Sequence, residues 1–148
     1  MSTLDLSLHL AAPPEKLMEL AIDYEKLSTY LPRQLKNVEI IEKNDNETIT
    51  QEILTFKTII KNEIEQKTKH SVENNTIKSE ILSGPAKGTT VNITYDKEDE
   101  GTLVFIKFNL KLSLKAKFLQ PLIKKVYKSM LTGVLYKMNN VIMENQTN

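Results

Sequence analysis

Cysteine and histidine, two residue types that often serve as nucleophiles, general bases or metal ligands, are scarce in this 148-residue sequence. There is no cysteine, which excludes disulfides, thiolate–metal sites and a cysteine nucleophile. With only His9 and His70, no multi-histidine metal site is expected, and we predict neither a metal nor a cofactor. His70 could act as a general base with Tyr95 or Tyr127 as donors, but the pattern places no carboxylate to orient it. A lone histidine in a strand is more often structural, so we assign no catalytic residue.

The charged residues are unevenly distributed along the chain. The net charge is +1, yet residues 1–100 carry 12 basic and 18 acidic residues, whereas residues 101–143 carry eight lysines and no acid. Such a block indicates a face that meets lipid headgroups, nucleic acid or an acidic protein. The alternative is that the lysines only form a solvated face. We predict contact with an anionic surface through Lys115, Lys117, Lys124, Lys125 and Lys128.

The scarcity of arginine bears on which anionic partner is expected. Arg33 is the only arginine beside 19 lysines. Arginine supplies the bidentate hydrogen bonds that read base edges, so sequence-specific nucleic-acid recognition is not expected. Lysines provide a diffuse field that suits an anionic membrane surface. Because the sequence shows no apolar run of ~20 residues and no signal peptide, we expect a cytoplasmic protein, with peripheral membrane contact as a further option.

Hydrophobic periodicity predicts the elements that must position these residues. Residues 4–10 alternate apolar and polar side chains, which is typical of a half-buried strand. Two short helices follow between residues 14 and 31. Residues 35–114 indicate about six strands joined by tight turns, hence an antiparallel meander. The last segment, about 118–143, predicts one long helix.

Two segments resemble a known superfamily. Residues 12–32, APPEKLMELAIDYEKLSTYLP, resemble the opening of the helix-grip fold of the START and birch-pollen-allergen superfamily. Residues 88–95, GTTVNITY, are similar to a strand start of its polyketide cyclase/dehydrase branch. The resemblance covers essentially the whole chain and implies one α+β domain, residues 1–148. In this fold a curved antiparallel sheet of about seven strands wraps around a long C-terminal helix, and two short helices follow the first strand.

The same resemblance implies a cavity between the sheet and the C-terminal helix. The sequence is also similar to coenzyme-Q-binding proteins of this superfamily, which implies a carrier of an apolar molecule. The strand and loop residues that make enzymes of some relatives have no recognisable counterpart here.

Strand parity and the helical stripe predict which residues face this cavity. They are mostly aliphatic, which suits an apolar ligand, although the same side chains would also fill a core. A polar row runs through them at Asn62, Gln66, Thr68 and His70. We favour a position at the open, wet end of the sheet over contact with a ligand's polar head. The predicted set is Ile60, Asn62, Ile64, Gln66, Thr68, His70, Ile77, Ser79, Ile81, Val91, Ile93, Tyr95, Val104, Ile106, Phe108, Leu110, Leu119, Ile123, Val126, Met130 and Val134.

Three functions are compatible with these observations. We predict binding or transport of one apolar small molecule, such as a lipid, quinone or isoprenoid, with membrane-surface contact as an option. One alternative is a small cyclase- or hydratase-type enzyme using His70 and a tyrosine, which requires His70 inside a pocket. The other is a protein-interaction domain that has a filled core and binds an acidic protein.

Overall fold

The computed structural model describes residues 2–55 and 63–146. Its strands and helices follow the predicted order, with one additional short 3-10 helix before the long helix. The elements are β1 (Ser2–Leu10), α1 (Pro14–Ala21), the 3-10 helix η1 (Tyr24–Thr29), β2 (Leu35–Lys43), β3 (Glu47–Thr55), β4 (Glu63–Glu73), β5 (Thr76–Ile81), β6 (Thr90–Glu98), β7 (Gly101–Leu110), the 3-10 helix η2 (Lys117–Leu119) and α2 (Gln120–Gln146).

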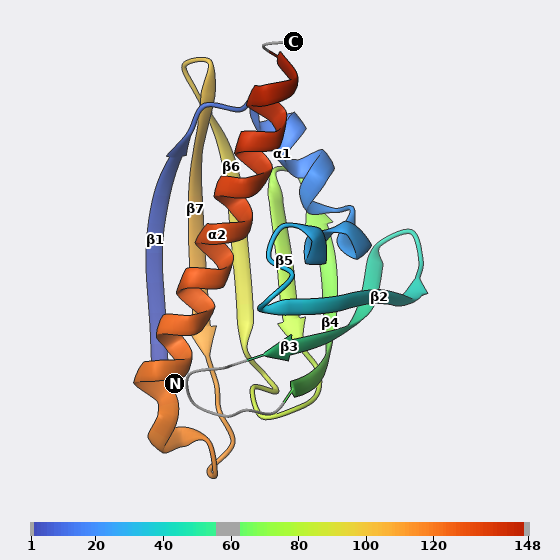
Figure 1. The fold of residues 1–148 in the computed structure, drawn as a ribbon, viewed down its shortest axis with the longest axis vertical. Helices are drawn as coiled ribbons and strands as arrows, with labels where there is room; N and C mark the ends of the chain where they lie inside the picture. The colour runs from blue at the N-terminus through green and yellow to red at the C-terminus, as the bar shows by residue number, and fades with distance from the viewer. Residues whose placement is uncertain (1, 56–62, 147–148) are drawn as a thin grey trace.

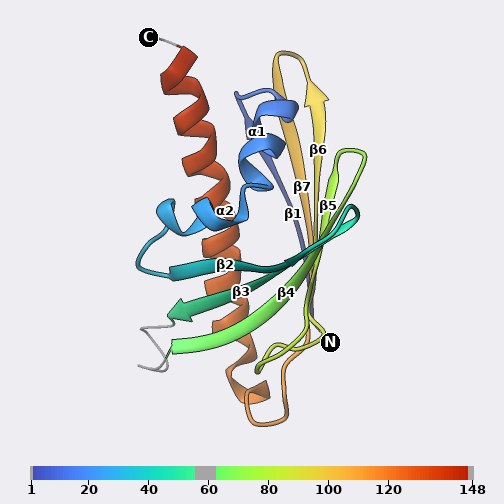
Figure 2. The ribbon, with the colours of Figure 1, turned by 90° about the vertical axis from the view of Figure 1, so that its right-hand side faces the viewer.

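The seven described strands form one antiparallel sheet in the order β1-β7-β6-β5-β4-β3-β2. From β2 to β7 each strand pairs with the next along the chain, and β1 pairs with β7 over its whole length. The sheet curves around α2: β1, β7 and β6 run along the helix, and β2 and β3 turn across it (Figure 1, Figure 2). The predicted helix-grip fold is therefore confirmed.

The inner face of the sheet is apolar because alternate residues of each strand point toward α2. On β7, Val104, Ile106 and Phe108 are almost completely buried, whereas Phe105 and Lys107 between them are exposed on the outer face. Burial of each large apolar side chain contributes about 1.5–3 kcal/mol relative to leaving it in water. The packing of this face against α2 thus holds the helix and sheet together.

The link between β1 and α1 is fixed to both the sheet and α2. Pro13 and Pro14 open α1, since proline suits the first turn of a helix. The backbone N–H of Ala12 donates to Asn139 Oδ1 at 2.9 Å, and Thr102 Oγ1 donates to the Ala12 carbonyl oxygen at 2.7 Å. These two hydrogen bonds join β1, β7 and α2, so that α1 and the following η1 are held beside α2.

The buried stripe of α2 differs in part from the predicted one. Ile123 is buried as predicted. However, Tyr127 and Leu135 are buried more deeply than Val126 and Val134, two members of the predicted stripe. The stripe was drawn from aliphatic residues and Met alone, and a tyrosine can bury its ring while its hydroxyl keeps a polar partner.

Candidate functional site

The inner face of the sheet and the helices line a partly open cavity of about 170 Å³. Its wall is mostly apolar, with a polar strip on β3 and β4. An engineered apolar cavity of about 150 Å³ binds benzene, so this volume accommodates one small ring. The lining residues are Leu35, Val38, Glu52, Leu54, Gln66, Thr68, His70, Ile77, Ser79, Ile81, Val91, Ile93 and Tyr95 from the strands, and Ala21, Tyr24, Leu27, Tyr127, Met130, Leu131, Val134, Leu135 and Met138 from the helices.

Part of the predicted set comes together around this cavity. The residues placed in its wall are Gln66, Thr68, His70, Ile77, Ser79, Ile81, Val91, Ile93, Tyr95, Met130 and Val134. The predicted positions Ile60 and Asn62 lie outside the described residues.

Other predicted positions do not reach the cavity. On β7 the side chains lie in the close-packed core, where the Phe108 ring lies 5.4 Å from that of Tyr127. Strand parity reports which face of the sheet a side chain occupies, but not the distance between the sheet and the helix at that point. The positions outside the wall are Ile64, Val104, Ile106, Phe108, Leu110, Leu119, Ile123 and Val126.

Some inward aliphatic side chains of the wall stay only half-buried. Val91 and Ile93 project from β6 toward α2, and Met130 and Val134 project from α2, yet all four keep intermediate exposure. Apolar surface left in contact with water is unfavourable by roughly 25 cal/mol per Å². A ligand of matching shape would cover this surface.

The polar strip is a hydrogen-bond network centred on Glu52. Its Oε1 accepts from Gln66 Nε2 at 2.9 Å and from Thr68 Oγ1 at 2.8 Å, and its Oε2 accepts from Thr50 Oγ1. The antiparallel register of β3 and β4 sets Glu52 directly opposite Gln66 and Thr50 opposite Thr68. Gln66 and Thr68 are buried in this wall. The interpretation that they mark the wet end of the sheet was therefore wrong.

His70 extends the network and uses both ring nitrogens. Because Thr50 Oγ1 donates its only proton to Glu52, it accepts from His70 Nε2 at 2.9 Å, so this nitrogen carries a proton. His70 Nδ1 lies 2.7 Å from Ser79 Oγ. The imidazole also stacks on the Tyr24 ring, with centroids 4.3 Å apart. These contacts fix the histidine's orientation.

The Glu52 carboxylate is held in its charged form. Burial raises the pKa of Glu52, but the neighbouring His70 and the hydrogen bonds from Thr50, Gln66 and Thr68 together lower it below the usual value. His70 Nε2 lies 3.8 Å from Glu52 Oε2. Among the described residues, no group of three or more histidine, aspartate or glutamate side chains could hold a metal ion.

Three tyrosines line the cavity, and they differ in their partners. The Tyr127 hydroxyl donates to Gln66 Oε1 at 3.2 Å. The hydroxyls of Tyr24 and Tyr95 have no hydrogen-bond partner within the described part of the chain. Of the side chains described, only Thr55 Oγ1 is both sealed from solvent and unpartnered, so these two phenol oxygens keep access to the cavity.

Both phenols remain protonated near neutral pH. Burial raises the pKa of Tyr24 to about 12. Burial, and then the neighbouring Tyr24, raise the pKa of Tyr95 above its ordinary value. These two phenols therefore add hydrogen-bond donors to a wall that is apolar outside the polar strip on β3 and β4.

Sequence reasoning missed Glu52, Tyr24 and the burial of Tyr127. The carboxylate that the pattern seemed to lack beside His70 is Glu52, which alternates in phase with Thr50 and Leu54 along β3. That alternation was a signal, but pairing β3 with β4 in register was needed to bring Glu52 to the histidine. Tyr24 reaches the site through η1, whose packing over the sheet has no local sequence pattern.

The sequence matches a known protein family over most of its length. A family model described as polyketide cyclase / dehydrase and lipid transport matches residues 10–138. The chain belongs to this family. The family's description covers both enzymes and lipid carriers, so membership alone does not choose between them. No curated protein sequence matches the chain significantly.

Solved structures share the fold of this polyketide cyclase/dehydrase family member. TTHA0849 from Thermus thermophilus superposes with a TM-score of 0.82 at 17% identity, covering 97% of this chain and 99% of that one. The Zhui aromatase/cyclase from Streptomyces sp. R1128 gives 0.79 at 11% identity, with 99% and 96% covered. A START superfamily protein from Mycobacterium smegmatis gives 0.76 at 13% identity, with 96% and 97% covered. At these identities the likeness shows the fold.

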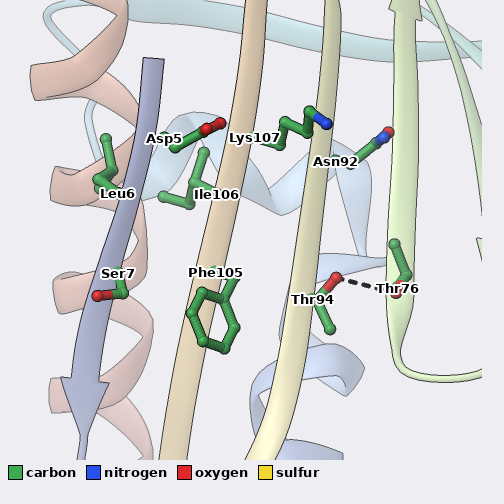
Figure 3. Close-up of a pocket in the computed structure, with 9 residues that line it drawn as sticks. All are labelled: Asp5, Leu6, Ser7, Thr76, Asn92, Thr94, Phe105, Ile106 and Lys107. Atoms are coloured by element: carbon green, nitrogen blue, oxygen red, sulfur yellow. Dashed lines mark hydrogen bonds between the residues drawn. The ribbon is translucent and has the colours of Figure 1, made fainter. Parts of the chain in front are cut away.

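A second hollow of about 550 Å³ lies on the outer face of the sheet (Figure 3). It is open and shallow, and Thr76 and Thr94 make a hydrogen bond of 3.0 Å at one side of it. Although larger, it lacks the predominantly apolar wall of the inner cavity, so the inner cavity is the candidate site of this family member. The residues lining the outer hollow are Asp5, Leu6, Ser7, Thr76, Asn92, Thr94, Phe105, Ile106 and Lys107.

The predicted anionic-contact lysines do not line the cavity and lie between the end of β7 and the first turns of α2. Lys115, Lys117, Lys125 and Lys128 are exposed, and Lys124 is partly exposed. No ion pair involves any of the five within the described residues. No helix in the described ranges has both the length and the hydropathy to cross a bilayer.

Proposed function

We propose that the protein binds one apolar small molecule, a lipid, quinone or isoprenoid, in the cavity between the sheet and α2. The observation that carries this proposal is the mostly aliphatic cavity wall, in which Val91, Ile93, Met130 and Val134 are only half-buried. A ligand that covers these side chains gains roughly 25 cal/mol per Å² before ordering costs. The cavity argues against the filled core of an interaction domain.

The cavity volume limits which part of such a ligand is enclosed. About 170 Å³ accommodates a single substituted ring or one branched isoprenoid unit. Larger ligand pockets usually span about 300–1,000 Å³. In this proposal the ring or the end of the chain is enclosed, and a longer tail extends outside.

The polar groups of the wall favour a neutral ligand that carries an oxygen atom. The Tyr24 and Tyr95 hydroxyls are donors without a partner among the described residues and suit a carbonyl or hydroxyl oxygen. The buried charge of Glu52 disfavours an anionic head in the same space. A quinone carbonyl meets both conditions.

The cyclase or hydratase alternative has one observation in its favour, the position of Glu52 beside His70 in the cavity wall. A general base needs a lone pair that faces the substrate. Here His70 Nε2 bonds Thr50 and His70 Nδ1 bonds Ser79. The network therefore favours a positioning role for His70 over proton transfer.

Methyl NMR of the methionines tests the binding proposal. Met130 and Met138 line the cavity, whereas Met18 and Met143 do not and serve as internal controls. We expect tetramethylbenzoquinone and its hydrocarbon counterpart tetramethylbenzene to shift the first pair of methyl signals and not the second. The quinone should bind about tenfold more tightly because it accepts from the phenols. Unchanged Met130 and Met138 signals with every apolar probe would overturn the proposal.

A further inference from the structure

An apolar cluster is exposed where β7 passes into α2. Leu114 and Phe118 are 86% and 79% exposed, and Leu122 in the first turn of α2 is 39% exposed. We call residues 111–128 the α2 tip. The tip projects beyond the sheet at the lower end of both views (Figure 1, Figure 2). Large apolar side chains gathered on a projecting segment indicate a contact surface, since scattered single ones are the norm.

Lysines lie before, between and after these apolar residues along the chain, and the stability of the fold does not account for them. The tip contains six lysines and no acidic residue. Positive charge near the N-terminus of a helix opposes the helix dipole, and the first turn of α2 has no acid to offset it. The tip lysines are Lys111, Lys115, Lys117, Lys124, Lys125 and Lys128, and none pairs with a described carboxylate.

The opposite end of the molecule has the opposite charge. The turn between β6 and β7 carries Glu98, Asp99 and Glu100, all exposed. This turn lies at the upper end in Figure 1, and the α2 tip lies at the lower end. An anionic surface would therefore attract the tip and repel the β6–β7 turn, which orients the whole protein.

We propose that the α2 tip binds the surface of an anionic lipid bilayer, with Leu114 and Phe118 inserted at headgroup depth and the lysines on the anionic headgroups. The composition favours lipid over a protein partner, because protein interfaces are enriched in arginine and depleted in lysine. Lysines next to exposed leucine and phenylalanine are typical of interfacial membrane contact. This inference rests on surface residues and does not depend on the cavity.

Docking at the tip would bring the cavity near the lipid phase. Leu122 in the tip and Tyr127 in the cavity wall lie on the same helix. Five residues of α-helix span about 7.5 Å. An apolar ligand that leaves the bilayer would therefore meet the protein close to its binding site.

Vesicle co-sedimentation of the full chain tests the charge requirement. We expect binding to vesicles of phosphatidylcholine with phosphatidylserine, none to phosphatidylcholine alone, and loss of binding at high salt. The double variant Lys115→Gln/Lys117→Gln should bind about 25-fold more weakly, about fivefold for each lysine. The matched variant Lys16→Gln/Lys97→Gln, which changes exposed lysines outside the tip, should bind like the wild type.

A fluorescence measurement tests insertion. The chain has no tryptophan, so Phe118→Trp reports only from the tip. We expect its emission to shift to the blue with phosphatidylserine vesicles, while Phe105→Trp, on the outer face of β7, should not shift. An unshifted Phe118→Trp, or equal binding by both lysine variants, would overturn the proposal. Binding to polyglutamate in place of vesicles would overturn it in favour of an acidic protein.

Discussion

The β3–β4 wall of the cavity is polar and bonded within itself, whereas the β6–α2 wall is aliphatic and left partly uncovered. Glu52 accepts hydrogen bonds from its neighbours on both strands, and His70 bonds Thr50 and Ser79. By contrast, the side chains of Val91 and Ile93 are not fully covered by their neighbours and remain half-buried. The two walls face the same space but present it with different surfaces.

This difference separates stability from binding. A buried polar network stabilises the fold only while every member has its partner. An uncovered aliphatic surface contributes little to folding and gains free energy when a ligand covers it. Substitutions in the polar wall should therefore lower the free energy of unfolding first, and substitutions in the aliphatic wall should lower ligand affinity first.

The largest effect is expected from Glu52→Ala. Removing the carboxylate leaves the donors of Thr50, Gln66 and Thr68 without their acceptor inside the protein. Loss of one partner of a buried charged network costs about 3–5 kcal/mol of unfolding free energy. Urea denaturation measures it. The control Glu39→Ala removes an exposed glutamate of β2 and should change stability by less than about 0.5 kcal/mol. Equal effects for the two variants would contradict the assignment of the network.

The next largest effects are expected from replacing either of two valines by phenylalanine, one at the cavity and one in the core. Val91 borders the cavity, and Val104 is fully buried in the packed core. We expect Val104→Phe to lose about 1–3 kcal/mol by overpacking, whereas Val91→Phe fills free space and keeps its stability. Titration with tetramethylbenzoquinone should show at least a tenfold loss of affinity for Val91→Phe. A stable Val91→Phe variant that still binds tetramethylbenzoquinone with wild-type affinity would show that the ligand does not bind in the cavity.

The decrease in the free energy of unfolding at acidic pH should depend on Glu52. Its pKa is lowered in the folded protein, so its contribution is complete above the unfolded value of 4.5 and is lost as the pH falls through the folded value. The slope is at most about 1.4 kcal/mol per pH unit for one proton. Urea midpoints between pH 3 and 7 should therefore fall more steeply in acid for the wild type than for Glu52→Gln. Parallel curves would show that Glu52 is not the group responsible.

The smallest effect is expected from removing single phenol oxygens. Tyr127→Phe deletes the hydrogen bond to Gln66 and should cost about 1 kcal/mol of unfolding free energy. Tyr95→Phe deletes a hydroxyl that has no partner in the described ranges of the chain, so stability should stay within about 0.5 kcal/mol. Quinone affinity should respond in the reverse order, with the larger loss in Tyr95→Phe. If Tyr95→Phe loses stability and keeps its affinity, the phenol is a structural group.

The sequence was sufficient for the fold but not for the composition of the site. Alternation along β6 and β7 and the resemblance at residues 12–32 predicted the sheet, the helices and their order, because these signals are local. Glu52 was missed because its role depends on the register between β3 and β4. The residues of β7 were placed in the cavity although they lie in the packed core, because parity carries no information on the gap between sheet and helix. The exposure of Leu114 and Phe118 was not predicted either, because it depends on how the segment between β7 and α2 projects from the fold.

Native mass spectrometry of protein purified from its own cells tests the central claim most directly, with Val91→Phe prepared in parallel. If the β6–α2 wall binds a ligand, each wild-type chain should carry one apolar adduct that is released by organic extraction, and Val91→Phe should carry none. An adduct present in equal amount on both proteins would place the ligand outside the cavity. Adduct-free wild type, with no uptake from a panel of quinones, lipids and isoprenoids, would contradict the proposal that the β6–α2 wall binds a ligand.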